Sequence, residues 1–522
     1  MSYHDSTPLS VALCRSSMDG AVLLQPLQAA PTPTLAAFNL KNLARIVKPG
    51  QRYRIIVRYK KPSLPLFGRR LLAAAPIRPP RRPLSFRLST TLIPIVILLG
   101  AITLMAQMGV TYQAFTDIQH FNRSSLFQAS PLTTTTAFRS EIASEAVPQL
   151  DLFAKRSGSN EKFVREAAMA YRKIAEVQGY GRLSNRGDVP SAAVNLKKAV
   201  SILDGVPKAD AQSSKELAIS LQRLANVLSL AGMNEQARAS AQRSIAILSK
   251  LKGNTYDLEL SAAWSELSSI EGRTGRKQES LAAARRAIEV STGLPGDRRE
   301  YLAQAYQRLS AAISSAQGPT QEALNAAQTA VNLYGSAGQT CGDGVDCRAA
   351  YFTAIESLGQ IHSEAGRHDE VLKLVVDSEI EIRQMVSRDP NNHLLLRQLR
   401  HLQYMAGLAL QGTHRIPEAL SKYQESINTG VQMTATSLNT DATCNLIQAR
   451  VRYASLLALK TPKEAESEWN EARRLIQLTS SAGNSMCLQV GDLPNLERSD
   501  KAQIRVPIAL SKPPMRGGMG GF

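Results

Sequence analysis

A pattern of small and apolar residues, repeated seven times, constrains the fold of this chain more than any other feature. It lies between residues 140 and 480, where Pro is rare, and reads Ala-x-x-x-(apolar or aromatic)-x-x-(Ala or Ser) with occasional substitutions. The first positions are 45, 43, 43, 48, 48 and 46 residues apart. A period of this length predicts an array of repeats, and apolar residues at i, i+3, i+4 and i+7 predict amphipathic helices. The copies are Ala192, Leu196 and Ala199; Ala237, Ala241 and Ser244; Ser280, Ala284 and Ala287; Ala323, Ala327 and Ala330; Val371, Val375 and Ser378; Ala419, Tyr423 and Ser426; and Ala465, Trp469 and Ala472.

Each copy follows another amphipathic segment, so the repeat unit is predicted to be a pair of helices. Small side chains at i, i+4 and i+7 share one face and let the partner helix approach closely. Gly232, Gly275 and Gly366 stand where a first helix would end in a left-handed residue. We therefore predict an all-α, helical-hairpin solenoid of about seven helix pairs over residues 140–480, with a flexible tail at 481–522.

Residues 88–116 carry no charge, and their apolar core, 89–113, predicts one transmembrane helix. About 20 such residues span the roughly 30 Å hydrocarbon layer. Six arginines lie within 20 residues before the run, and the first base after it is Arg123. By the positive-inside rule we expect a cytoplasmic N-terminus and repeats outside a bacterial inner (cell) membrane, after a linker at 114–139. A buried core helix and a cleaved signal peptide are the alternatives, and the second would need a different start codon.

The N-terminal segment 1–88 concentrates the positive charge of the chain. It holds 15 Lys and Arg against 2 acids, out of a net charge of +19 for all 522 residues. Recurrent Pro breaks helices and strands, so we expect this cytoplasmic segment to be largely disordered, with one possible strand at 53–59. Its charge would be attracted to anionic head groups. Binding to nucleic acid is the alternative use of such charge, but no nucleic-acid partner is expected.

No motif in the chain indicates catalysis. A G-x-S-x-G elbow, a phosphate loop and paired carboxylates beyond ordinary helix surfaces are missing from the sequence. His362 and His368 flank a turn, but a metal site needs more ligands at closer spacing. We therefore expect no enzyme activity, no catalytic residue, no metal, no cofactor and no small-molecule substrate.

The five cysteines agree with the expected topology. Cys14 lies on the inner side, and the other four lie on the outer side, where disulfides form. Cys341 and Cys347 enclose a short loop with two glycines, and we predict a disulfide between them, with Cys444 and Cys487 as a possible second pair. Four cysteines permit three pairings, and four buried reduced thiols are the alternative.

The repeats resemble the tetratricopeptide repeat. The best local matches are Trp264 and Leu267 with Gly275, and Leu358 and Gly359 with Gly366. The usual period of that family is 34 residues, so the longer units here are similar to the variant with extended helices found in kinesin light chains. The resemblance covers about residues 140–480 and implies a protein-binding scaffold.

The resemblance also implies a ligand-binding groove, because the first helix of each pair lines the concave face in that family. Its positions are mostly amides and hydroxyls, which can bond to a peptide backbone, and they lack the Lys and Arg cluster with which some members hold a C-terminal carboxylate. An extended peptide is the implied ligand, and solvated polar positions without a ligand are the alternative. The groove residues are Arg172, Glu176, Gln222, Asn226, Ser265, Ser269, Gln307, Glu356, Gln360, His401 and Tyr404.

A narrower resemblance links the first repeat to the outer sensor half of certain bacterial receptor-type Ser/Thr protein kinases. It rests on residues 170–179, on 184–188 before Ala192, and on 389–392. Only 88 residues precede the predicted membrane helix, and they contain none of the kinase motifs. The sequence therefore predicts a membrane-anchored scaffold that binds a protein or peptide outside the membrane. A kinase-family sensor without its catalytic domain is one alternative, and a nucleic-acid binder that uses residues 1–88 is another.

Overall fold

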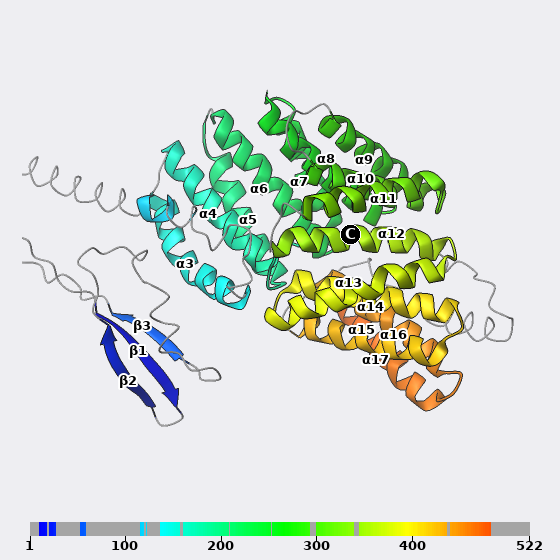
Figure 1. Cartoon of the computed structure of the whole chain (residues 1–522). Helices are drawn as coiled ribbons and strands as arrows, with labels where there is room; N and C mark the ends of the chain where they lie inside the picture. Colours follow the sequence, from blue (N-terminus) through cyan, green and yellow to red (C-terminus); the bar gives the residue numbers. More distant parts are fainter. Residues whose placement is uncertain are drawn as a thin grey trace, which may run out of the picture. The chain divides into compact units, whose positions relative to one another are not determined.

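The chain forms two compact units, Met1–Ile95 and Val96–Phe522 (Figure 1). The structure is a computed structural model. It describes residues 10–17, 20–27, 53–58, 115–119, 122, 136–156, 160–207, 209–251, 253–292, 299–338, 344–435 and 439–481.

The first unit contains a three-stranded antiparallel sheet of order β2-β1-β3. Its strands are β1 (Ser10–Ser17), β2 (Gly20–Leu27) and β3 (Tyr53–Arg58). The strand expected at 53–59 is present as β3, whereas the sequence analysis did not anticipate β1 and β2. Pro26 lies in β2, which is an edge strand, and an edge tolerates a residue without an N–H.

The described residues of the second unit form seven consecutive helix pairs, preceded by α3 (Thr136–Arg156). The predicted all-α helical repeat, similar to the tetratricopeptide repeat, is confirmed. The first helices are α4 (Glu161–Gly179), α6 (Ala211–Leu230), α8 (Asn254–Arg273), α10 (Arg299–Gln317), α12 (Val345–Glu364), α14 (His393–Gly412) and α16 (Thr440–Leu457). The second helices are α5 (Val189–Asp204), α7 (Asn234–Leu248), α9 (Lys277–Thr292), α11 (Gln321–Gly338), α13 (His368–Arg388), α15 (Ile416–Thr434) and α17 (Pro462–Ser481).

The repeated small residues lie on the buried face of the second helices. None of the 21 residues in the seven copies is more than 7% exposed. In three copies the hydroxyl of a serine bonds to a carbonyl of the first helix, as in the contact of Ser244 with Ala218 at 2.7 Å and of Ser426 with Arg400 at 3.1 Å, whereas the Ser378 hydroxyl bonds to Leu374 in its own helix. A buried polar group needs such a partner, so serine can replace alanine here only because the helices approach closely.

Glycine ends several first helices as predicted. Gly232, Gly275 and Gly366 have φ values of 78°, 76° and 72°, in the left-handed region that favours glycine. The backbone N–H of the next residue, as at Met233, then donates to a carbonyl of the last helical turn, Leu228, at 2.8 Å. These turns reverse the chain within a few residues and hold each pair together.

The predicted membrane span at 89–113 lies outside the described residues. None of the helices that are described combines the length and the apolar content needed to cross a bilayer. Most of the linker at 114–139 and nearly all of the tail at 481–522 also lie outside them.

Two of the four cysteines expected on the outer side are oxidised. Cys347, near the start of α12, and Cys444, in α16, are each disulfide-bonded. Cys341 and Cys487 lie outside the described residues. The pairings of Cys341 with Cys347 and of Cys444 with Cys487 therefore stay predictions.

Candidate functional site

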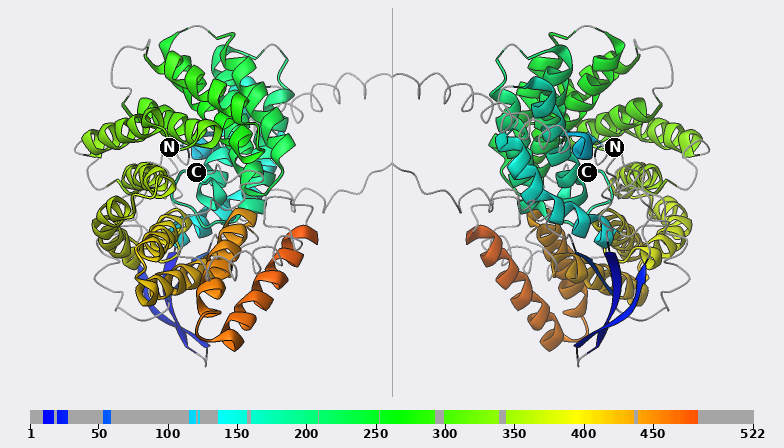
Figure 2. Two further views of the ribbon diagram at one scale, coloured as in Figure 1. Left: turned by 90° about the vertical axis from the view of Figure 1, so that its right-hand side faces the viewer. Right: turned by 90° about the vertical axis from the view of Figure 1, so that its left-hand side faces the viewer.

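The beginning of the helical array contacts its fifth pair, α12 and α13, and this contact closes the inner side of the array. Thr136, at the start of α3, donates its backbone N–H to both carboxylate oxygens of Asp389, at 3.2 and 3.1 Å, and its hydroxyl to Oδ2. The backbone N–H of Ser184, in the α4–α5 turn, donates to Oδ1 of Asp346 at 2.8 Å. Figure 2 shows how α3–α5 and α12–α14 curve toward the same central region.

Two glycines let the α4–α5 turn lie against the sixth pair. Gly187 has a φ of 75°, and a Cβ there would overlap the His393 ring. A Cβ on Gly181 would lie 2.8 Å from Leu230 Cδ1 and 3.6 Å from Arg397 Nη1. Larger residues would therefore push the turn away from α6 and α14, and the turn would no longer form part of the inner wall.

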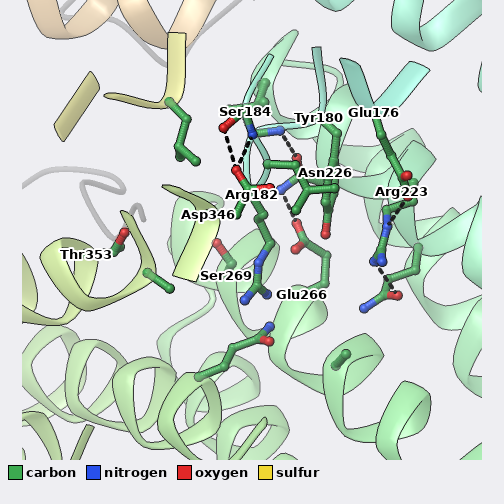
Figure 3. Close-up of a pocket in the computed structure, with 18 of the residues that line it drawn as sticks. Glu176, Tyr180, Arg182, Ser184, Arg223, Asn226, Glu266, Ser269, Asp346 and Thr353 are labelled. Atoms are coloured by element: carbon green, nitrogen blue, oxygen red, sulfur yellow. Dashed lines mark hydrogen bonds and ion pairs between the residues drawn. The ribbon is translucent and has the colours of Figure 1, made fainter. Parts of the chain in front are cut away.

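The closed inner side contains a cavity of about 400 Å³, and Figure 3 shows its lining. The wall comes mainly from α4, α6, α8, α10, α12 and α14 and from the α4–α5 turn. Pockets for small ligands have volumes of about 300–1,000 Å³, so the cavity is large enough for a ligand. Its charged lining residues are Arg139, Lys173, Arg182, Arg223, Arg273, Arg308 and Arg397, with Glu176, Glu259, Glu266, Glu300 and Asp346.

A buried ion-pair network forms the wall on α4 and α6. Arg172 bonds through Nε to Glu216 at 2.6 Å and through Nη1 to Glu176 at 2.9 Å, and Arg223 Nε bonds to Glu176 at 3.1 Å. Burial would raise the pKa of Glu176, but the charges of Arg172 and Arg223 outweigh it and hold that pKa below its ordinary value. Glu176 is thus a charged, fully engaged acid and orients Arg223 beside the cavity.

Three arginines of the lining make no ion pair with the described residues: Arg182, Arg308 and Arg397. Arg308 is 8% exposed. Burial, and to a smaller extent the charge of Arg182, lower its pKa to about 10. Burial also lowers the pKa of Arg397, where Glu356 and Asp441 act in the opposite direction. The cavity therefore contains guanidinium charge that the surrounding acids do not balance.

Five of the predicted groove residues line the cavity, but their polar groups already have partners. Asn226 accepts from Gly181 N at 3.1 Å and donates to Glu266 at 3.0 Å. Gln307 donates to the Thr353 carbonyl at 3.1 Å. The amides expected to hold a peptide backbone thus brace the wall instead. The five are Glu176, Gln222, Asn226, Ser269 and Gln307.

The other six predicted groove residues lie outside the cavity wall. Ser265 and Glu356 are 0% exposed, beneath the inner surface. Gln360 donates to Glu364 at 3.0 Å along α12. Arg172 belongs to the buried network, and His401 and Tyr404 lie on α14 beyond the cavity-lining residues of that helix. The solenoid pattern locates the first helices correctly, but it does not indicate where the array closes.

The arginines of the cavity were not among the predicted residues. Arg182 comes from a turn, which the repeat pattern does not cover, and Arg308 directly follows the predicted Gln307. The row of groove positions lacks basic residues other than Arg172 and His401, whereas seven bases line the cavity, of which five lie at other positions of α3, α4, α6, α8 and α10 and two come from the turn and α14. The only sequence signal for the turn was residues 184–188, which carry the resemblance to kinase sensor halves.

The cavity in the described part of the chain offers several kinds of binding group. No group of three or more His, Cys, Asp and Glu side chains is placed to hold a metal ion within it. The residues that line the cavity include no histidine, and Cys347 is in a disulfide. The arrangement can therefore supply charge, hydrogen bonds and aromatic surface to a bound molecule.

Comparisons with known proteins give only distant likenesses. No family model matches the chain, and no curated protein matches its sequence. The chain is similar to a Rap protein complexed with competence and sporulation factor, with 13% identity and a TM-score of 0.44 over 71% of this chain and 99% of that one. It is also similar to a tetratricopeptide repeat protein from Parabacteroides merdae, with 15% identity and a TM-score of 0.29 over 60% and 93% of the two chains.

Proposed function

We propose that this chain is a membrane-anchored helical array that binds a peptide, or a peptide segment of a protein, in its central cavity on the outer side of the membrane. The observation that supports this most is the closure of the array around a cavity lined from six of the seven helix pairs. First helices line the concave side of such arrays, and the closure here turns that side into an enclosed polar space large enough for a ligand.

The composition of the wall favours a peptide among possible ligands. It combines both signs of charge with the amide of Gln304 and the rings of Tyr301 and Tyr334. Peptides carry donors, acceptors and side chains that such a wall can match. A cavity of about 400 Å³ suits a few residues rather than the extended segment expected along the whole groove.

The membrane location is part of the proposal. It is supported by the uncharged run at 89–113 with arginines before it. Cys347 and Cys444 each take part in a disulfide, which also fits an oxidising compartment, since disulfides persist outside the cytoplasm and are rare within it. A sensor half of the receptor-kinase type remains the alternative, because the resemblance at residues 170–179 lies in α4 at the cavity wall.

Site-specific photo-crosslinking in intact cells tests the proposal. Glu300 is exposed and lines the cavity, so Glu300→p-benzoylphenylalanine should place the crosslinker at the ligand without disturbing the core. Gln328, exposed on the second helix of the same pair, provides the matched control. We expect a peptide or protein adduct at position 300 that is missing at 328. Identical adducts at both positions, or none at 300, would contradict binding in the cavity.

A further inference from the structure

Three hydrogen-bond donors in one region of the cavity have no acceptor among the described residues. They are Gln304 Nε2, Arg308 Nε and Arg397 Nε. Gln304 is 4% exposed, and Arg308 lies one turn further along α10 on the same face. Buried polar groups are hydrogen-bonded in nearly all native structures, so donors that converge on a cavity indicate a ligand that supplies acceptors.

The described acids near these donors are bonded to other groups or make no hydrogen bond. Glu266 accepts from Asn226 at 3.0 Å, and Asp346 accepts from Ser184. Glu356 is buried behind Arg397 and makes no hydrogen bond with the described residues, and burial raises its pKa to about 8. Arg182, Arg308 and Arg397 therefore have no carboxylate partner among the described residues, unlike Arg223 and Arg273, which pair with Glu176 and Asp441.

We propose that this region of the cavity binds the carboxylates of an acidic peptide, with Arg182, Arg308 and Arg397 as the charged contacts and Gln304 as a neutral donor. This inference rests on the proposed peptide-binding function and names the chemistry of the peptide. An ionised carboxylate only accepts hydrogen bonds, and arginine matches it with two parallel N–H groups. The site needs such a group, because the three unsatisfied atoms of the lining named above, on Gln304, Arg308 and Arg397, are all donors.

A peptide carboxylate fits the site better than a free polyanion does. Seven bases and five acids line the cavity, and Arg273 among the bases is paired with Asp441 outside the lining, so positive charge is left over for a carboxylate. Glu259 and Glu300 belong to the same wall and would repel a compact, multiply charged phosphate. They can instead accept backbone N–H groups, which a peptide supplies and a phosphate does not.

Titration calorimetry on the full chain in mild detergent tests the proposal. The probes are acetyl-Ala-Glu-Glu-Ala-amide, its isostere acetyl-Ala-Gln-Gln-Ala-amide, and inorganic phosphate; the blocked termini leave the side chains as the only carboxylates. We expect the Glu peptide to bind at least tenfold more tightly than the Gln peptide and than phosphate. Because one charge-assisted bond is lost, Arg308→Gln should weaken the Glu peptide about 10- to 100-fold.

Two further variants separate binding from folding. Arg182→Gln changes a turn residue rather than the core and should weaken the Glu peptide to a similar extent. Arg286→Gln changes an exposed arginine of α9 that pairs with Glu289 away from the cavity, and it should leave binding unchanged. Unchanged helical circular dichroism in all three variants would show that loss of binding is not loss of fold.

Several outcomes would overturn the inference. Equal binding of the two peptides, or no saturable binding of the Glu peptide up to about 1 mM, would remove the carboxylate site. Tighter binding of phosphate than of the Glu peptide would assign the donors to a phosphoryl group instead. If crosslinking at Glu300 captures a partner but the Glu peptide shows no preference, the peptide-binding function stands and the acidic specificity fails. If the Glu peptide binds but no adduct forms in cells, the site is real and the proposed scaffold function fails.

Discussion

The contact between Thr136 and Asp389 should control the closure of the array around its cavity. It joins residues that are 253 positions apart, so no single repeat depends on it. Asp389→Ala removes the acceptor for the backbone N–H and the hydroxyl of Thr136, and for Asn392 Nδ2 at 3.3 Å. Thr136 is 0% exposed, so its N–H would remain buried without a partner unless α3 separates from α13.

The size of the effect follows from the bonds that are lost. A buried donor without an acceptor costs about 1–3 kcal/mol, and a bond to a charged acceptor contributes about 1.5–3 kcal/mol. We therefore expect Asp389→Ala to lower the free energy of opening this contact by about 3 kcal/mol. Every 1.4 kcal/mol is a factor of ten, so opening should become roughly 100-fold more frequent. Asp389→Asn keeps one acceptor oxygen and should lose less.

Amide hydrogen exchange on the full chain measures this directly, because it reports opening helix by helix. In Asp389→Ala, exchange should accelerate in α3 and the α4–α5 turn, while α8 and α9 keep their protection. Asp377→Ala, at an exposed site on α13, is the control and should change stability by less than about 0.5 kcal/mol. If α3 exchanges equally slowly in the parent and in Asp389→Ala, the contact does not hold the array closed.

Three further perturbations test other parts of the structure. Burial raises the pKa of Glu356 from 4.5 to about 8, so between these two pH values the folded chain retains a proton that the unfolded chain loses. The free energy of unfolding should therefore fall as the pH rises from 4.5 to about 8. Glu356→Gln should make the accompanying decline of Tm less steep. Ala241 is 0% exposed, so Ala241→Leu should overpack its helix pair. Chemical denaturation should then show a free energy of unfolding lower by about 1–3 kcal/mol. Ala239→Leu, on the exposed face of the same helix, should leave it unchanged. On reduced spheroplasts, an impermeant thiol reagent should label Cys347 and spare Cys14; the reverse pattern would contradict the proposed topology.

The repeats could be predicted from the sequence because local geometry decides them. A small residue at Ala192 or Ala284 has the same consequence in every copy, since it sets how closely two neighbouring helices pack. Gly232 and Gly366 likewise act only on the turn that contains them. The strands β1 and β2 were missed for the opposite reason. The content of Pro argued against them, although Pro26 lies at an edge where the sheet does not need its N–H.

The closure of the array could not be predicted, because it depends on the sum of small rotations between successive pairs. That sum brings the turn with Arg182 toward Arg308 and Arg397, which belong to the fourth and sixth pairs and share no pattern with it. The closure also explains why the amides that were predicted to bind a ligand are bonded within the wall instead. Asn226 and Gln307 found partners within the wall, as buried amides do wherever a neighbour is in reach. In the cavity lining, hydrogen-bonding capacity is left over at Arg308 and Arg397, where arginines lie near one another and cannot pair.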